Sequence, residues 1–349
     1  MTTAAKPATE VEPEVAQDLL LEVEDLRTYF YIEEGEIPAV DGVTFSVKRG
    51  QILAIVGESG CGKSVTAYSI LRLVQEPGEI VGGRITLYPK DHDRIDITAL
   101  DEGSDLLYDV RGGSISMIFQ EPMTALSPVH TVGNQICEAI LLLQDVTEEE
   151  AEERAVAMLG KVGIPGPRTR LGQYPHEMSG GMRQRVVIAM ALVCDPELLI
   201  ADEPTTALDV TIQAQIMKLM VDLQRDLGTS VMLITHDLGV VAQMAEEVAV
   251  MYLGRIVEQA DVHKLMKDPW HPYTMGLLKS LPSLSPRHGR LPSIKGSVPS
   301  LTEIPPGCPF HPRCPYAELG VCDVGGPPPI RELVPGRTVA CVRAEEIRP

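Results

Sequence analysis

The chain has 349 residues, of which 44% are hydrophobic but only 4% aromatic, so we expect a large core of mainly aliphatic side chains. Its 30 basic and 49 acidic residues give a formal net charge of −19, which argues against nucleic acid as a partner because phosphate backbones select basic surfaces. No apolar run is long enough to span a bilayer and the N-terminus lacks the pattern of a signal peptide, so we expect a cytoplasmic protein.

The N-terminal part predicts a disordered tail followed by an antiparallel β subdomain. Residues 1–18 are polar and rich in Ala, Pro and Glu, a composition typical of disordered tails. Short apolar patterns typical of strands then follow over Leu19–Leu26, Thr28–Ile32, Val43–Val47 and Gly82–Leu87. We expect these strands to form an antiparallel patch beside an α/β core.

A phosphate-binding loop lies within this region. Residues 57–64 match the motif G-x-x-x-x-G-K-S, with a predicted buried strand (Gln51–Val56) before it and a predicted helix (Val65–Leu71) after it. Glycines free backbone N–H groups to surround phosphates, Lys63 supplies charge near the β- and γ-phosphates, and the Ser64 hydroxyl is expected to ligate Mg²⁺. We therefore predict nucleotide contacts from Gly57, Glu58, Ser59, Gly60, Cys61, Gly62, Lys63, Ser64 and Val65.

A helical block then interrupts the α/β alternation. A buried strand predicted over Ile115–Phe119 ends at Gln120. Thr147 and Glu150 form a capping box, and apolar residues follow at helical spacing until Gly163. These patterns predict a helical subdomain at about 121–180.

The alternation resumes after this block. The apolar patterns predict a helix over 186–192, a strand over Leu198–Ala201, a helix over Ile212–Leu227, and strands over Ser230–Thr235 and Glu247–Leu253. These elements predict an α/β core.

Two carboxylates follow the strand Leu198–Ala201. The carboxyl ends of strands are where open α/β sheets bind ligands, so Asp202 is predicted to hold Mg²⁺ and Glu203 to polarise the attacking water. Ser179 is predicted to cap the helix that precedes this strand, and Gly180 and Gly181 leave backbone N–H groups open to a phosphate.

In their order, the motifs of residues 19–270 resemble the ATP-binding subunit of ABC transporters. They include the phosphate loop, Gln120, Ser179–Gly181, the Asp202–Glu203 pair, the Ala-Leu-Asp sequence at 207–209, and His236 after a strand. The resemblance implies an ATPase with a P-loop (RecA-like) core, in which Phe30 stacks on adenine, with Tyr29 as the alternative. It implies catalytic roles for Lys63, Gln120, Glu203 and His236, and an Mg²⁺ site of Ser64, Gln120 and Asp202.

The same resemblance implies that two such subunits work together. A signature sequence, here Ser179, Gly180, Gly181 and Met182, would close over the ATP of the partner subunit, and Asp209 would lie in a loop that crosses the dimer interface. Met178 and Met182 replace the Leu and Gln that the family usually carries at the ends of this signature.

Other segments resemble the dipeptide and oligopeptide importers: residues 120–128, His271–Thr274, 296–301 and 307–315. This implies a motor at the cytoplasmic face of the cell membrane. Its partners would be a second ATPase subunit (a copy or a paralogue), two transmembrane permease subunits and an extracellular solute-binding protein. Importers of oligosaccharides, nickel or glutathione have similar motors, and a soluble ABC ATPase without a transport role is the remaining alternative.

Beyond Trp270 the density of Pro and Gly predicts a separate, irregular extension over residues 271–349. Four of the seven cysteines cluster there: Cys308, Cys314, Cys322 and Cys341. Four thiolates in a segment with little core predict metal ligands. The resemblance implies a [4Fe–4S] cluster, with Zn²⁺ as the alternative and free thiols as the remaining possibility.

Overall fold

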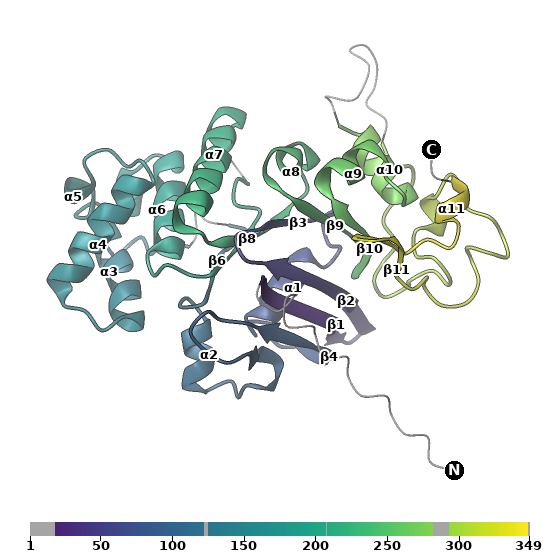
Figure 1. Cartoon of the computed structure of the whole chain (residues 1–349), viewed down its shortest axis with the longest axis horizontal. Helices are drawn as coiled ribbons and strands as arrows, with labels where there is room; N and C mark the ends of the chain where they lie inside the picture. The colour runs from purple at the N-terminus through teal and green to yellow at the C-terminus, as the bar shows by residue number, and fades with distance from the viewer. Residues whose placement is uncertain (1–17, 122–124, 207, 282–292, 348–349) are drawn as a thin grey trace.

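A computed structural model describes residues 18–121, 125–206, 208–281 and 293–347. The predicted tail, apart from Asp18, lies outside the described residues, as do residues 122–124 and Ala207 of the motifs given above. Figure 1 shows a helical lobe at one end of the molecule, β-sheets in the middle and the C-terminal segment at the other end. Within the described ranges, no helix combines the length and apolar character that crossing a membrane requires.

The central sheet has eight strands: β3 (Ile52–Val56), β6 (Ile115–Ile118), β7 (Leu198–Asp202), β8 (Ser230–Thr235), β9 (Glu247–Tyr252), β10 (Arg255–Asp261), β11 (Arg331–Val334) and β12 (Arg337–Val339). Their spatial order is β11-β12-β10-β9-β3-β8-β7-β6. The neighbours from β9 to β6 run parallel, whereas β10, β11 and β12 pair antiparallel. The predicted α/β core is thereby confirmed, with parallel pairing from β9 to β6.

Both faces of the inner strands β3, β7 and β8 are buried, which explains their mainly apolar sequences. In β3, Ile52, Ala54 and Val56 pack into one hydrophobic core, whereas Leu53 and Ile55 pack into a second. Strands β7 and β8 divide their side chains between the same two cores in the same way. A strand that is covered on both faces has no position where a polar side chain reaches water.

The second sheet covers one face of the central sheet (Figure 1). It consists of β1 (Leu19–Ile32), β2 (Gly35–Lys48), β4 (Gly78–Leu87) and β5 (Ile95–Asp96), in the antiparallel order β2-β1-β4-β5. Strand β1 is continuous where the sequence predicts two segments. The register with β2 shifts between Leu26 and Arg27, at the break between the two predicted segments, and a further bulge precedes it at Asp25, which has φ 46°.

The helices fall into three groups. Next to the second sheet lie α1 (Lys63–Ile70) and α2 (Asp105–Val110). The lobe contains α3 (Val132–Leu143), α4 (Glu148–Lys161), α5 (Pro167–Arg170) and α6 (Gly180–Leu192). The remaining helices are α7 (Val210–Leu227), α8 (Leu238–Met244), α9 (Val262–Lys267), α10 (Pro272–Lys279) and α11 (Ala344–Ile347). The capping box of α4 is confirmed, since Glu150 N–H donates to Thr147 Oγ1 at 3.2 Å and Thr147 N–H donates to Glu150 Oε2 at 3.0 Å. Helix α6 begins at Gly180, earlier than predicted.

The C-terminal extension is more regular, and more closely joined to the core, than the sequence predicts. Strand β12 pairs with β10, placing Val339 opposite Glu258, and β11 adds a further strand to the same sheet. Tyr273 and Phe310 lie in the same hydrophobic core as β3 and β7. The prediction of an irregular extension misses β11 and β12, because strands this short show no recognisable alternation.

Candidate active site

The phosphate loop wraps tightly between β3 and α1. Gly60 (φ 77°) and Gly62 (φ 101°) adopt left-handed conformations, which turn the loop into the start of α1. A Cβ at Gly57 would lie 2.2 Å from the carbonyl oxygen of Met251, and one at Gly62 would lie 2.2 Å from that of Ala39. Only glycine fits at these two positions, so the backbone itself forms the cradle.

Lys63 lies over this cradle. Its side chain is buried, and its Nζ donates to the carbonyl oxygens of Gly57 at 3.0 Å and Glu58 at 3.1 Å. The cation is therefore held inside the loop, where it can neutralise phosphate oxygens. Ser64 follows at the first turn of α1.

Asp202 presents a buried carboxylate next to the loop. It is the last residue of β7, and among the described residues neither of its oxygens has a hydrogen-bond partner. Burial raises the pKa of Asp202, which the nearby Ser64 hydroxyl and Lys63 ammonium oppose. A buried carboxylate without a partner is costly unless a cation compensates it, so Asp202 and Ser64 fit a divalent metal such as Mg²⁺.

Glu203 follows Asp202 and, unlike it, has side-chain partners, Thr206 and His236. Its Oε1 lies 3.3 Å from His236 Nδ1, and its Oε2 accepts a hydrogen bond of 2.9 Å from Thr206 Oγ1. Burial acts to raise the pKa of Glu203, but the hydrogen bonds from Thr206 and His236, with the nearby charge of Lys63, outweigh burial and lower it. The carboxylate is thereby ionised at neutral pH and can accept a hydrogen bond from water.

The parallel sheet brings these residues together, because strands β3, β6, β7 and β8 end at one edge. Lys63, Asp202, Glu203 and His236 gather there, and Gln120 lies exposed just after β6. The His236 side chain is 67% exposed, which leaves one face open to a ligand. The sequence-predicted residues of phosphate binding and hydrolysis thus form one constellation.

The aromatic residues proposed for adenine lie in β1. The ring of Phe30 packs over Gly78, whose added Cβ would lie 2.6 Å from it, and Phe30 is half-buried. The hydroxyl of Tyr29 is engaged with Asp41 Oδ1 at 2.9 Å. No described contact joins either ring to the phosphate loop.

The signature residues lie at the start of α6. Ser179 caps α6, as predicted, because its Oγ accepts from Met182 N–H at 3.4 Å. A Cβ at Gly181 would lie 3.2 Å from Ile212 of α7, and Asp209 caps α7. In the described part of the chain, no hydrogen bond connects Ser179–Met182 to the phosphate loop.

The four clustered cysteines line one small cavity of about 20 Å³, and all are free thiols. Burial raises the pKa of Cys308 and of Cys314 to about 11. Neighbouring cysteines add to this shift, whereas backbone hydrogen bonds oppose it. Within the described ranges, no three His, Cys, Asp or Glu side chains are placed to hold a metal ion. The fold gathers the four thiols but does not arrange them as ligands.

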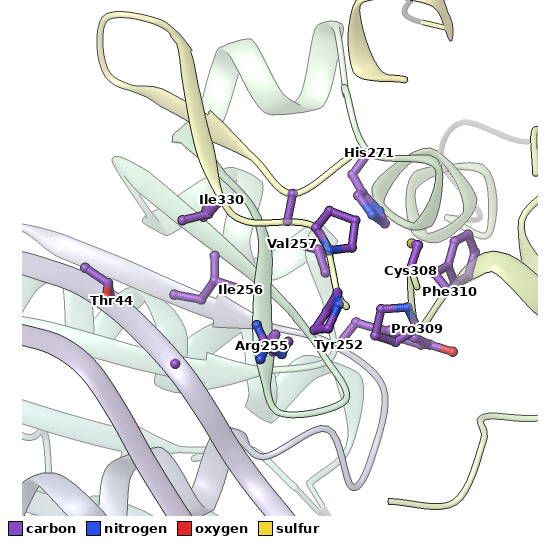
Figure 2. A pocket seen from close by; sticks show the side chains of 14 residues that line it. Thr44, Tyr252, Arg255, Ile256, Val257, His271, Cys308, Pro309, Phe310 and Ile330 are labelled. Carbon is purple, nitrogen blue, oxygen red and sulfur yellow. The ribbon is translucent and has the colours of Figure 1, made fainter. Parts of the chain in front are cut away.

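Sequence reasoning assigned no role to Arg313, yet its guanidinium pairs with Glu58 of the phosphate loop at 2.6 Å. In the sequence, Arg313 is marked only as a charged residue between Cys308 and Cys314, and this position does not indicate a contact with Glu58. Figure 2 shows the neighbouring junction, where Cys308, Pro309 and Phe310 of the extension meet Tyr252 and Ile256 around a cavity of about 50 Å³.

The chain matches two family models: "ABC transporter" over residues 40–206 and "Oligopeptide/dipeptide transporter, C-terminal region" over residues 257–322. A probable peptide ABC transporter ATP-binding protein of Sinorhizobium fredii is 55% identical, with 95% of this chain and 96% of that protein covered. The oligopeptide transport ATP-binding protein AppD of Bacillus subtilis is 50% identical, with 94% and 97% covered. A dimeric bacterial ABC transporter cassette is similar in structure, with a TM-score of 0.61, 26% identity, and 70% of this chain and 99% of the cassette covered.

Proposed function

Because the chain belongs to the family of ABC transporter ATP-binding proteins, we propose that it is the ATP-hydrolysing motor subunit of a peptide importer. One observation carries the ATPase activity: Lys63, Asp202, Glu203 and His236 meet at the carboxyl edge of one parallel sheet. The peptide cargo is supported by the names of the relatives and by the second family model, which covers part of the extension.

In this proposal the chain binds and orients ATP for attack by water. The N–H groups of residues 57–65 and the Lys63 ammonium bind the phosphates, and Phe30 stacks on the adenine. Mg²⁺, held by Ser64, Asp202 and Gln120, would neutralise charge on the transferred phosphoryl group. Glu203 accepts a hydrogen bond from the attacking water, and its contact with His236 supports its orientation.

We further propose that the active form contains two ATPase subunits. The signature Ser179–Met182 makes no described hydrogen bond to the phosphate loop of its own chain, and Asp209 bonds to the start of α7, which is consistent with contacts to the ATP of a partner. ATP bound between two subunits favours the closed pair, and hydrolysis removes that contribution. This cycle would drive two transmembrane permease subunits at the cytoplasmic face of the membrane, to which a solute-binding protein delivers peptide.

Affinity purification from detergent-solubilised membranes tests the transport role. We expect the tagged chain to recover two multispanning proteins and a second ATPase subunit, and deletion of its gene to abolish uptake of labelled tripeptide. If the deletion strain instead kept peptide uptake and lost the uptake of nickel, glutathione or an oligosaccharide, the proposed cargo would be wrong. Recovery of the chain without any membrane protein would contradict the transport role and favour a soluble ABC ATPase.

We also propose that Cys308, Cys314, Cys322 and Cys341 close around a [4Fe–4S] cluster when it binds, because thiolates are its ligands. The support is that all four line one cavity, since no three of them are placed as metal ligands in the described structure. Protein purified anaerobically should be brown and contain iron and sulfide. Cys314→Ser should lose both, whereas Cys194→Ser, whose thiol contacts Ala139 in the helical lobe, should keep them. Colourless protein with stoichiometric zinc would replace the cluster with Zn²⁺, and metal-free protein would contradict both.

A further inference from the structure

The extension reaches the phosphate loop through an ion pair that buries Arg313 and leaves Glu58 partly exposed. Arg313 donates from Nη1 to Glu58 Oε2 at 2.6 Å and from Nη2 to Glu58 Oε1 at 2.9 Å. The Arg313 side chain is 4% exposed and that of Glu58 is 29% exposed. A bidentate pair of this kind fixes direction as well as distance, and the burial of Arg313 reduces the screening of the pair by salt.

The extension and the end of β9 together hold Arg313 in place. Its guanidinium carbon lies 5.9 Å from the ring centroids of Tyr252 and Phe310, and its Nε donates to the Lys295 carbonyl oxygen at 3.3 Å. The 3₁₀ turn His311–Arg313 carries it. The guanidinium is therefore set before any ligand binds.

Glu58 is tied by its backbone as well as by its side chain. Its N–H donates to the hydroxyl of Tyr273 in α10 at 2.9 Å, and its carbonyl oxygen accepts from Lys63 Nζ at 3.1 Å and from Cys61 N–H at 3.3 Å. Two of these contacts, those to Tyr273 and Arg313, come from beyond residue 270. The C-terminal part of the chain thus restrains the first turn of the phosphate loop.

We propose that Arg313 and Tyr273 are positioning residues that hold the phosphate loop ready for nucleotide, so that the extension sets the affinity for ATP. A loop that is already fixed in its bound conformation binds its ligand more tightly, because it loses less conformational entropy on binding. Arg313 also neutralises a carboxylate within the loop, which would otherwise repel the phosphates. The inference rests on the proposed nucleotide binding and adds a role for the extension in it.

Nucleotide affinity measured with a fluorescent ATP analogue tests this role in the purified full-length chain. We expect Arg313→Ala to raise Kd roughly tenfold, as the KM for ATP rises while kcat stays within about twofold. Arg313→Lys, which keeps the charge but not the bidentate geometry, should fall between wild type and Arg313→Ala.

A double variant separates this role from a general loss of stability. Glu58→Gln removes the carboxylate left unpaired in Arg313→Ala, so the double variant should bind the analogue more tightly than Arg313→Ala alone. Arg343→Ala serves as the matched control, because Arg343 bonds to Tyr316 and Glu346 within the extension and should leave Kd unchanged.

Equal Kd values for wild type and Arg313→Ala, or an equal rise in Arg343→Ala, would overturn the inference. Absence of binding by the wild type would instead overturn the proposed nucleotide site. Should Arg313→Ala not fold, Tyr273→Phe provides the test, because it deletes only the hydroxyl that accepts from Glu58 N–H. We expect Tyr273→Phe to raise Kd severalfold, and an unchanged Kd would contradict the role of Tyr273.

Discussion

Replacing Glu203 with Gln is expected to lower kcat for ATP hydrolysis by at least about 100-fold while ATP still binds. The carboxylate is held by Thr206 and His236 and is ionised at neutral pH, so it can accept a hydrogen bond from the attacking water. The amide of Gln is similar in size but is a far weaker base. Phosphate release by the complex, measured beside equilibrium binding of ATP, separates the two steps.

We also expect the Glu203→Gln variant to remain as a closed, ATP-bound pair of ATPase subunits, because hydrolysis no longer opens the pair. Size-exclusion chromatography with ATP and Mg²⁺ measures this pairing. Glu138→Gln is a matched control, since Glu138 is exposed on α3, and it should hydrolyse ATP at the wild-type rate. A Glu203→Gln variant with near wild-type steady-state turnover would assign the activation of water to another residue.

The site could be predicted from the sequence where local pattern and motif coincide. Strand β7 is apolar throughout because both of its faces are buried, and its end therefore marks where Asp202 and Glu203 emerge. The same reasoning located Gln120 after β6 and His236 after β8. Parallel pairing then places these strand ends at one edge, so motif order was enough to predict the constellation.

Contacts between distant segments could not be predicted in this way. The Arg313–Glu58 pair joins residues 255 positions apart, and neither a periodicity nor a spacing encodes it. The pairing of β12 with β10 is equally long-range, and β12 is too short to show a strand pattern. The extension therefore looked irregular in sequence although its contacts to the core are specific.

These contacts change how the extension relates to the ATP site. The predicted boundary between Trp270 and His271 runs through a buried network, because the N–H groups of both residues donate to Glu258 of β10. His271 is fully enclosed, and burial lowers its pKa to about 3, so its neutral ring accepts from Tyr273 N–H at the start of α10. Residues on both sides of this boundary thus position Tyr273, which in turn contacts the phosphate loop.

Arg337→Ala is expected to destabilise the fold by about 3–5 kcal/mol, because it leaves a buried carboxylate without its counter-charge. Arg337 lies between Glu258, at 3.3 Å, and Asp268, at 3.0 Å, and its guanidinium stacks 3.6 Å from the Trp270 ring centroid. Glu258 is fully buried. Its remaining partners, the N–H groups of Trp270 and His271, supply hydrogen bonds but no full charge.

The loss of stability in Arg337→Ala should depend on pH in a defined direction. Burial already raises the pKa of Glu258, against the N–H groups and Arg337 that lower it, so removing Arg337 raises the pKa further. The folded state then binds more protons than the unfolded state, and the stability of the variant falls as pH rises. The deficit relative to wild type should shrink as pH is lowered toward about 5.

Urea unfolding followed by circular dichroism, at neutral and acidic pH, measures both effects. Arg84→Ala, which removes an exposed ion pair with Asp96, is the matched control and should change the midpoint little. A second variant, Glu258→Met combined with Arg337→Met, replaces the charges with apolar side chains and should be less destabilised than Arg337→Ala. If Arg337→Ala unfolded at the wild-type midpoint at neutral pH, the ion pair between β12 and β10 would not contribute to the stability of the fold.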